Sequence, residues 1–331
     1  MVRLSDVAVH AGVSVRTVSN VVNDFRHVAP DTRARVQASI AALGYRPNVA
    51  ARTLRSGRTG LLSLVVPEID SPYFAELAAR TVRIAEDDGW TVLIDQTDGD
   101  AARERRLLHG ERSQLVDGVI FSPWSTAAEE LATRRDATPF VLLGEHAGAP
   151  PVDHVVIDNV AAAREAVAHL LAGGRRDIAA IGIEASVANE TARQRQLGFR
   201  GALAAAGLPW RADREAAVTS LHRAEGHRAM SGLLAAGDRP DAVFCFSDEL
   251  ALGALRALAD AGLRVPDDVA LVGFDDIEDG RYAVPTLTTI APDKDRIAQL
   301  ALQVLRDRLA GDDRPARVIT APHRLVVRES S

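Results

Sequence analysis

With 331 residues, 47% of them apolar and 25% charged, the chain has the length and composition of a folded, soluble protein of two or three domains. The N-terminus meets polar residues at once and offers no apolar core for a signal peptide, and no run approaches the roughly 18 apolar residues of a membrane-spanning helix. The single cysteine, Cys245, rules out an internal disulfide framework, so we expect a cytoplasmic protein. Its net charge of −6 argues by itself against a nucleic-acid partner.

The charge is unevenly distributed along the chain. Residues 1–60 hold nine arginines against three acidic residues, a net charge of +6, which leaves −12 for the remainder. A basic segment attached to an acidic body is typical of a module that binds a polyanion. A basic tail that only aids solubility is the alternative interpretation.

The basic segment predicts two short helices joined at a glycine. Residues 4–11 form the first, with Ser5 as its candidate N-cap, and Gly12 supplies the turn. Ser14 is placed to cap a second helix over residues 15–22. This pattern is that of a helix-turn-helix.

A third helix is expected from residue 31 to about residue 43. Its apolar stripe consists of Ala34, Val36, Ile40 and Leu43. A small helical bundle with no role in DNA binding is the alternative, but the positive charge of the segment favours DNA.

Several short motifs carry a family resemblance. They are Ser5-Asp6-Val7-Ala8, Gly12-Val13-Ser14, Thr17-Val18-Ser19, Gly44-Tyr45-Arg46-Pro47-Asn48 and Ala51-Arg52-Thr53-Leu54. With them the chain resembles the LacI/GalR family of bacterial repressors, and the similarity continues over essentially the whole chain.

The resemblance implies which side chains meet DNA. Val15, Arg16 and Asn20 lie where family members read bases in the major groove, and their chemistry suits a thymine methyl group, a guanine and an adenine, respectively. Many relatives carry arginine at the position of Asn20, so the operator sequence does not follow from the resemblance. The expected phosphate contacts are Ser14, Thr17, Ser19 and Asn23.

Residues 48–54 resemble the hinge helix of the family. Such a helix is too short to be stable alone, and in the family it orders on the operator beside its partner in a dimer. Leu54 is then expected to wedge into a base step from the minor groove, with contacts from Asn48, Ala51 and Arg52. An ordinary linker is the alternative, and it is the interpretation of residues 55–60.

From residue 61 onward, apolar strand patterns alternate with alanine-rich helical patterns. The expected strands are 61–66, 91–94, 118–121, 140–143, 155–157, 178–183, 243–246, 269–274, 287–290 and 324–328. Helices are expected at 75–87, 161–172, 193–206, 249–261 and 295–309, among others. This alternation predicts parallel sheets covered by helices, with ligands bound beyond the carboxyl ends of the strands.

Polar and aromatic residues follow these strand ends. The candidate effector-binding residues are Asp70, Tyr73, Phe74, Trp124, Arg195, Ser247, Asp248 and Asp275. Carboxylates, an arginine and aromatic rings suit a polyhydroxylated ligand, and the resemblance places four of them (Asp70, Arg195, Ser247 and Asp275) at effector-contacting positions.

Structural roles are the alternative interpretation for some of these candidates. Asp248 is equally well explained as a helix N-cap, and Tyr73 and Phe74 as packing at the start of a helix. Some sugar-binding relatives have an aspartate where this chain has Gly144, and whether the adjacent Glu145 substitutes for it is undecided.

The expected architecture is an α/β protein with an N-terminal three-helix DNA-binding domain and a hinge helix. Its body resembles periplasmic binding proteins, with two doubly wound α/β subdomains joined by three crossovers. The expected boundaries are 1–47 for the helix-turn-helix domain, 48–60 for hinge and linker, and 61–331 for the body, with subdomain one at about 61–159 and 291–318 and subdomain two at about 162–288 and 319–331.

The expected function is that of a repressor of a carbohydrate-utilisation operon. It binds a palindromic operator in double-stranded DNA as a homodimer and responds to a mono- or oligosaccharide, with a nucleobase or nucleoside as the second candidate. No heptad tail follows the last strand, which favours a dimer over a coiled-coil tetramer.

Phosphate-loop, serine-hydrolase and zinc-protease motifs are absent, so neither an enzyme nor a cofactor is expected. A solute-binding protein is the other alternative, but it has no use for residues 1–60.

Overall fold

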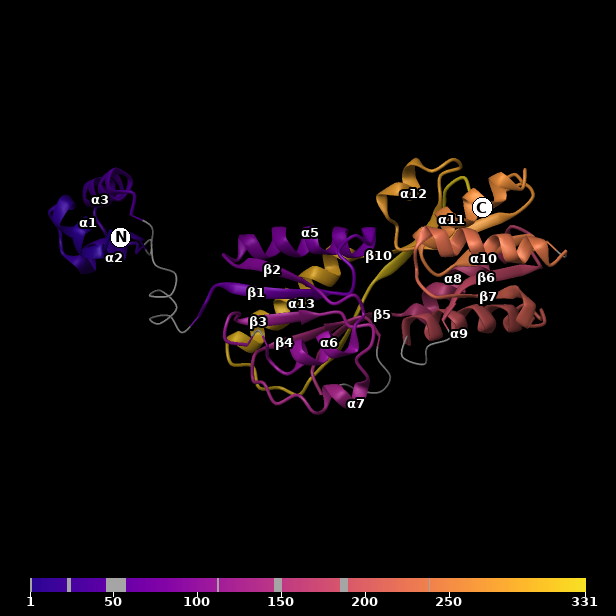
Figure 1. The fold of residues 1–331 in the computed structure, drawn as a ribbon, viewed down its shortest axis with the longest axis horizontal. Helices are drawn as coiled ribbons and strands as arrows, with labels where there is room; N and C mark the ends of the chain where they lie inside the picture. The colour runs from indigo at the N-terminus through magenta and orange to yellow at the C-terminus, as the bar shows by residue number, and fades with distance from the viewer. Residues whose placement is uncertain are drawn as a thin grey trace. The chain divides into compact units, whose positions relative to one another are not determined.

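The computed structural model describes residues 2–22, 25–45, 58–111, 113–145, 151–184, 190–237 and 239–331. It divides into two compact units, Met1–Gly60 and Leu61–Ser331 (Figure 1). Each unit has a hydrophobic core of its own, and each is described separately below.

The N-terminal unit is a three-helix domain. Its helices are α1 (Leu4–Ala11), α2 (Val15–Val22) and α3 (Pro30–Leu43). They enclose a small core of Val7, Ala8, Ala11, Val18, Val21, Val36 and Tyr45. Gly12 ends α1 with a φ of 63°, the left-handed conformation that a glycine adopts without strain.

The structure corrects three local predictions in this domain. The N-cap of α1 is Arg3 rather than Ser5, and the Asp6 carboxylate accepts the backbone N–H of Arg3 at 2.8 Å. Helix α3 begins at Pro30, because proline has no N–H to leave unpaired in a first helical turn. Ala34 is exposed, so it does not belong to the buried stripe.

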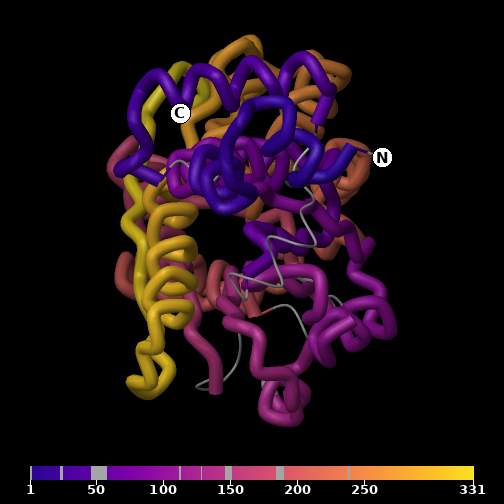
Figure 2. Tube along the Cα trace, turned by 90° about the vertical axis from the view of Figure 1, so that its left-hand side faces the viewer, coloured from indigo at the N-terminus to yellow at the C-terminus, as the bar shows by residue number. Residues whose placement is uncertain are grey.

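The second unit contains two six-stranded sheets with helices on both faces (Figures 1 and 2), which confirms the predicted α/β class. The first sheet has the order β11-β5-β4-β3-β1-β2, and all of its strand pairs are parallel. Its strands are β1 (Leu61–Val66), β2 (Thr91–Gln96), β3 (Gly118–Phe121), β4 (Phe140–Leu143), β5 (Asp153–Ile157) and β11 (Val318–Ala321).

The second sheet has the order β12-β10-β9-β8-β6-β7, and within it only β10 and β12 pair antiparallel. Its strands are β6 (Ile178–Glu184), β7 (Glu215–Val218), β8 (Ala242–Cys245), β9 (Ala270–Phe274), β10 (Thr288–Pro292) and β12 (His323–Val326). Of all these strands, β7 and β11 were not predicted, because neither has the fully buried apolar pattern of strands of equal length such as β3 and β4.

Helices complete the layers of the body. They are α5 (Pro72–Asp87), α6 (Ala101–Leu108), α7 (Ala128–Leu131), α8 (Asn159–Ala172), α9 (Glu190–Ala205), α10 (Arg223–Ala235), α11 (Asp248–Asp260), α12 (Glu278–Tyr282) and α13 (Lys294–Leu309), with a 3-10 turn η1 at Ala212–Arg214. Helices α5 and α13 pack together against the first sheet, while α8 with α9 and α10 with α11 pack against the second.

The pair α10–α11 approaches closely because glycines lie at the contact. A Cβ atom added at Gly253 would lie 1.9 Å from the backbone oxygen of Arg223, and one added at Gly226 would lie 2.1 Å from that of Leu250. Both positions therefore exclude any side chain.

The chain passes between the two sheets three times. Asp158 follows β5 and its side chain accepts the backbone N–H of Ala161 at 2.8 Å to cap α8; Asp293 follows β10 and caps α13 in the same way through Arg296. The third passage follows Ala321, because β11 pairs with β5 at the edge of the first sheet. The expected boundary between residues 318 and 319 therefore falls inside a strand of the first sheet.

Among the residues that the structure describes, no helix combines the length and the apolar character needed to cross a membrane.

Candidate functional site

The N-terminal domain presents the predicted base-reading residues on α2. The Ser14 hydroxyl accepts the backbone N–H of Thr17 at 3.1 Å and lies 2.9 Å from its hydroxyl, so Ser14 caps the helix as expected. Val15 and Arg16 are exposed in the first turn, and Asn20 is half-buried one turn later.

The other predicted DNA contacts differ in their surroundings. Ser19 is buried within the domain, so it is the least accessible of the phosphate candidates, whereas Ser14 is exposed. Asn23 and the hinge residues lie outside the described residues, and their roles stay predictions. Those hinge residues are Asn48, Ala51, Arg52 and Leu54.

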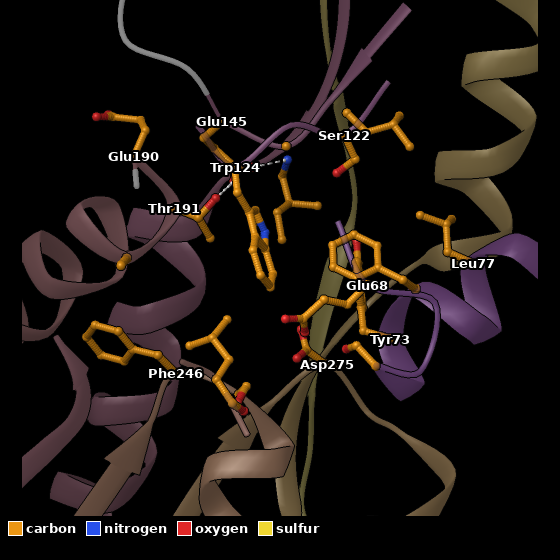
Figure 3. Close-up of a pocket in the computed structure, with 18 of the residues that line it drawn as sticks. Glu68, Tyr73, Leu77, Ser122, Trp124, Glu145, Glu190, Thr191, Phe246 and Asp275 are labelled. Atoms are coloured by element: carbon orange, nitrogen blue, oxygen red, sulfur yellow. Dashed lines mark hydrogen bonds between the residues drawn. The ribbon is translucent and has the colours of Figure 1, made fainter. Parts of the chain in front are cut away.

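In the body, a cavity opens where the carboxyl ends of strands from the two sheets come together (Figure 3). It encloses about 1260 Å³ of empty space, including its opening to solvent. Six of the eight predicted effector residues line it: Tyr73, Phe74, Trp124, Arg195, Ser247 and Asp275. Most of the residues predicted from the strand ends therefore lie together in one cavity.

Arg195 is held rigidly in this cavity. Its Nε donates to the side-chain oxygen of Asn159 at 2.8 Å, and another of its nitrogens donates to the backbone oxygen of Phe246. The guanidinium carbon lies 3.5 Å from the centre of the Phe274 ring. Since these contacts come from α8, β9 and the end of β8, the cation is oriented before any ligand arrives.

Asp275 is the first residue after β9. Its φ of 114° is rare for a residue with a side chain, and its backbone N–H donates to the oxygen of Ile290 at 2.8 Å. Burial raises the pKa of its carboxyl to about 7, although the charges of Arg195 and Lys294 act in the opposite direction. Near neutral pH this group can therefore either donate or accept a hydrogen bond.

Aromatic rings form one wall of the cavity. Tyr73 and Phe74 meet edge to face with ring centres 5.1 Å apart, and Trp124 lies 6.2 Å from Phe74. Phe74 also belongs to the main core, so the packing role and the lining role both apply to it. Buried Glu104 fixes the loop of Trp124 by accepting its backbone N–H at 2.8 Å and that of Ser125 at 2.9 Å.

Glu145 brings a carboxyl group into the cavity directly after Gly144. Its oxygens accept the backbone N–H of Ile157 at 3.1 Å and the hydroxyl of Thr191 at 2.6 Å. Burial raises the pKa of this carboxyl, and the two hydrogen bonds oppose the shift. Because Thr191 belongs to α9, Glu145 links the two subdomains across the cavity (Figure 3).

Two predicted residues lie elsewhere. Asp70 is exposed and is not part of the cavity lining. Asp248 is fully buried, and its oxygens accept the backbone N–H of Ile277 at 2.9 Å and the hydroxyl of Thr289 at 2.6 Å. Asp248 therefore ties α11 to β10 and to the loop after β9, while the helix cap is Ser247, whose hydroxyl accepts the N–H of Leu250 at 3.1 Å.

Comparison with known proteins identifies both units. Residues 3–48 match the family "Bacterial regulatory proteins, lacI family", and residues 167–331 match the periplasmic binding protein-like domain. A curated relative, the HTH-type transcriptional repressor PurR of Mannheimia succiniciproducens, is 33% identical over all of this chain and 98% of its own length. The chain belongs to the LacI family.

Solved structures agree with this membership of the LacI family. A lac repressor dimer bound to operator and the anti-inducer ONPF is 27% identical, with a TM-score of 0.86 over 99% of this chain and 98% of that one. A complex of the transcriptional regulator CelR with cellobiose is 30% identical, with a TM-score of 0.73 over the full length of both chains. This LacI-family protein is thus a DNA-binding transcriptional repressor and not an enzyme.

The cavity of this LacI-family chain also holds a trio of titratable residues, Glu68, His222 and Glu249, which were not among the predicted site residues. His222 lies between two carboxylates: its Nδ1 is 3.1 Å from Glu249 and its Nε2 is 3.3 Å from Glu68. Glu68 follows β1 and Glu249 follows Ser247, so the strand-end argument was sufficient to find both. His222 comes after β7, the strand that the pattern did not reveal.

Proposed function

We propose that this repressor binds a palindromic operator as a homodimer and that a mono- or oligosaccharide, held in the cavity of its body, modulates this binding. On this proposal, residues 1–47 read the operator, residues 48–60 form the hinge and linker, and residues 61–331 bind the effector and dimerise. The regulated genes are then those of carbohydrate utilisation.

The chemistry of the cavity is the observation that supports a sugar effector. Arg195, Asp275 and Glu145 offer a fixed cation and two carboxyl groups that hydrogen-bond to hydroxyl groups. Trp124 and Tyr73 offer ring faces or edges to the apolar side of a pyranose. A few placed polar groups within an apolar lining are typical of small-molecule sites. The cellobiose complex of the CelR neighbour supports the same class of ligand.

Dimeric binding to a palindrome is supported by the size of the DNA-binding domain. One helix-turn-helix covers a single half-site, and two-fold related copies meet two half-sites. The lac repressor neighbour was solved as a dimer on its operator. Exposed Arg16 and Val15 at the start of α2 supply base contacts, and exposed Ser14 supplies a phosphate contact.

A nucleobase or nucleoside is the second candidate effector. Its support is the aromatic wall formed by Tyr73, Phe74 and Trp124, because a planar base stacks on such rings. The protonatable Asp275 and Glu145 carboxyls suit the mixed donors and acceptors on the edge of a base.

A thermal-shift screen of the full chain against monosaccharides, disaccharides and nucleosides tests the proposal. A ligand at 100 times its Kd stabilises the folded state by about 2.7 kcal/mol, which is a clear rise in Tm. The active compound must also change operator retention in a mobility-shift assay. Stabilisation by a nucleoside alone favours the second candidate, and a response to none of the three classes refutes both.

A further inference from the structure

His222 occupies an unusual place in the cavity. Its side chain is 42% exposed, whereas those of Glu68 and Glu249 are only 20% and 9% exposed. Glu68 extends from the first subdomain after β1, and Glu249 lies in the first turn of α11 in the second. The imidazole therefore stands between carboxylates that belong to different subdomains.

The two distances define the protonation state that this arrangement needs. A neutral imidazole has one N–H group, so it can donate to only one carboxylate. Its other nitrogen carries a lone pair, which is repelled by the oxygen of an ionised second carboxylate. An imidazolium has two N–H groups and satisfies both Glu249 at 3.1 Å and Glu68 at 3.3 Å. Both distances are short enough for a charged ring that donates to each carboxylate.

We propose that His222 is a proton-dependent latch, which joins the two subdomains by binding Glu68 and Glu249 together and breaks when the ring loses its proton. This proposal rests on the proposed function in one respect, that the cavity it spans is the effector site. The latch itself acts in the effector-free chain.

Other charged groups lie near the two carboxylates of the latch. Asp70 lies near Glu68 and adds negative charge; Arg223 lies 4.0 Å from Glu249 and is also paired with Asp279 of α12 at 3.0 Å. Arg223 does not reach Glu68, so the single cation between the two carboxylates in the described structure is His222. The latch therefore depends on its proton.

The direction of the pH dependence follows from the groups involved. Burial lowers the pKa of His222, but the hydrogen bond and charge of Glu249 together with the charge of Glu68 outweigh it, and the pKa of the ring is raised above 6.5. The latch is thus complete below that value and is lost as pH rises through the raised pKa. Burial also raises the pKa of Glu68, so the latch weakens again in acid as this carboxylate is protonated.

The neighbouring contact between the subdomains behaves differently. Thr191 donates its hydroxyl to Glu145, and a hydroxyl can hydrogen-bond to a carboxyl in either of its protonation states. The pH change that breaks the latch therefore does not by itself remove that contact. Proton uptake at His222 consequently shifts the balance between joined and separated subdomains, and with it the affinity for any effector that both subdomains contact.

Distance measurement between the subdomains tests the latch directly. Exposed Ala102 of α6 and Ala204 of α9 are replaced by cysteine and spin-labelled in the full, effector-free chain, because the native Cys245 is buried and does not compete for label. Double electron–electron resonance is then recorded from pH 5 to pH 9. The expected short-distance population falls as pH rises through the raised pKa of His222, and it falls again in acid as Glu68 is protonated.

Three variants separate the latch from general effects of pH. In His222→Gln and in Glu68→Gln the loss of the short distance at alkaline pH disappears, because the first variant lacks the titrating ring and the second lacks the carboxylate that the charged ring binds. His227→Gln is the matched control: His227 lies 3.1 Å from Asp260, but both belong to the second subdomain, so this variant keeps the wild-type profile. In an independent NMR titration, the pKa of His222 falls towards 6.5 in Glu68→Gln.

A wild-type distance distribution that does not change with pH would overturn the latch, as would an unchanged alkaline transition in His222→Gln. Neither result bears on the proposed function, which stands or falls with the ligand screen and operator binding. Conversely, if no sugar or nucleoside binds, the proposed function fails, but the latch is still tested by the pH dependence of the distances in the effector-free chain.

Discussion

Replacement of Arg195 by methionine tests whether this side chain organises the cavity. The change keeps an unbranched side chain of similar reach and removes the hydrogen bonds to Asn159 and to the backbone of Phe246. Each buried acceptor left without a donor costs about 1–3 kcal/mol, and loss of the contact with the Phe274 ring adds about 0.5–2 kcal/mol. The lower sum of these losses is about 2.5 kcal/mol, and we expect the free energy of unfolding to decrease by at least that amount.

Urea unfolding of the full chain measures this loss, and Arg256→Met is the matched control. Arg256 also forms an ion pair, with Asp260 at 2.7 Å, but its side chain is 74% exposed. An exposed pair contributes less than about 1 kcal/mol, so the control should stay near wild type. Equal stability of the two variants would refute the buried network around Arg195.

The same variant should lose the thermal shift caused by effector, since the fixed cation is gone. Operator affinity without effector should stay near wild type, because Arg195 lies in the body and not in the DNA-binding domain. A second signature is electrostatic. Arg195 lowers the pKa of Asp275, so without it the Asp275 carboxyl should keep its proton to a pH above about 7. An unchanged titration of Asp275 would contradict this coupling.

Four further predictions follow from single features. Arg16→Ala should weaken operator binding by about 1–3 kcal/mol and relax preference at one base pair per half-site, measured by mobility shift over operator variants. Gly253→Ala should lower stability by about 2 kcal/mol or more in urea, because its Cβ would overlap backbone of α10 at 1.9 Å. Glu104→Gln should cost about 1.5–3 kcal/mol and shift the fluorescence of Trp124, because an amide offers an N–H to the N–H groups that the carboxylate now accepts. The pKa of Asp275 is about 7 in the folded state and 3.8 for the ordinary group, so its contribution to the free energy of unfolding should decrease as pH rises between these values. Asp275→Asn should remove this pH dependence of the free energy of unfolding, measured by urea titration at several pH values.

Each of these predictions has a clear contrary result. An unchanged base preference in Arg16→Ala would exclude it as a base contact, and wild-type stability in Gly253→Ala would mean that α10 and α11 can separate at little cost. Unaltered fluorescence in Glu104→Gln would show that Trp124 is held by other contacts. An unchanged pH slope in Asp275→Asn would place the titrating group elsewhere.

Buried strands made almost entirely of apolar residues were predictable because their pattern is local. The strands 61–66, 118–121 and 140–143 were predicted with the bounds of β1, β3 and β4. Strands at sheet edges were harder: β7 contains Glu-Ala-Ala-Val and β11 contains Val-Ile-Thr-Ala, and both owe their extended form to a neighbouring strand. Tertiary pairing rather than local propensity decides such segments.

The site was predictable as far as strand order places residues at one edge. Arg195, Asp275 and Trp124 were found because each follows a recognisable strand. The contact of His222 with Glu68 joins residues more than 150 positions apart, and only the placement of one subdomain against the other brings them together. The role of Asp248 was likewise hidden, since its partners Ile277 and Thr289 lie on other elements.

The two crossovers capped by Asp158 and Asp293 have a mechanical consequence. Each crossover consists of a single aspartate between a sheet strand and the helix that it caps. A change of backbone angle at this aspartate would rotate one subdomain against the other and leave the fold of each unchanged. Helix α13 spans 16 residues, or about 24 Å, beyond Asp293. A rotation of about 10° at the crossover therefore displaces the far end of this helix by about 4 Å, given a rise of about 1.5 Å per residue. A rearrangement around a ligand that bent this crossover would therefore displace the distant end of the first subdomain by several ångströms.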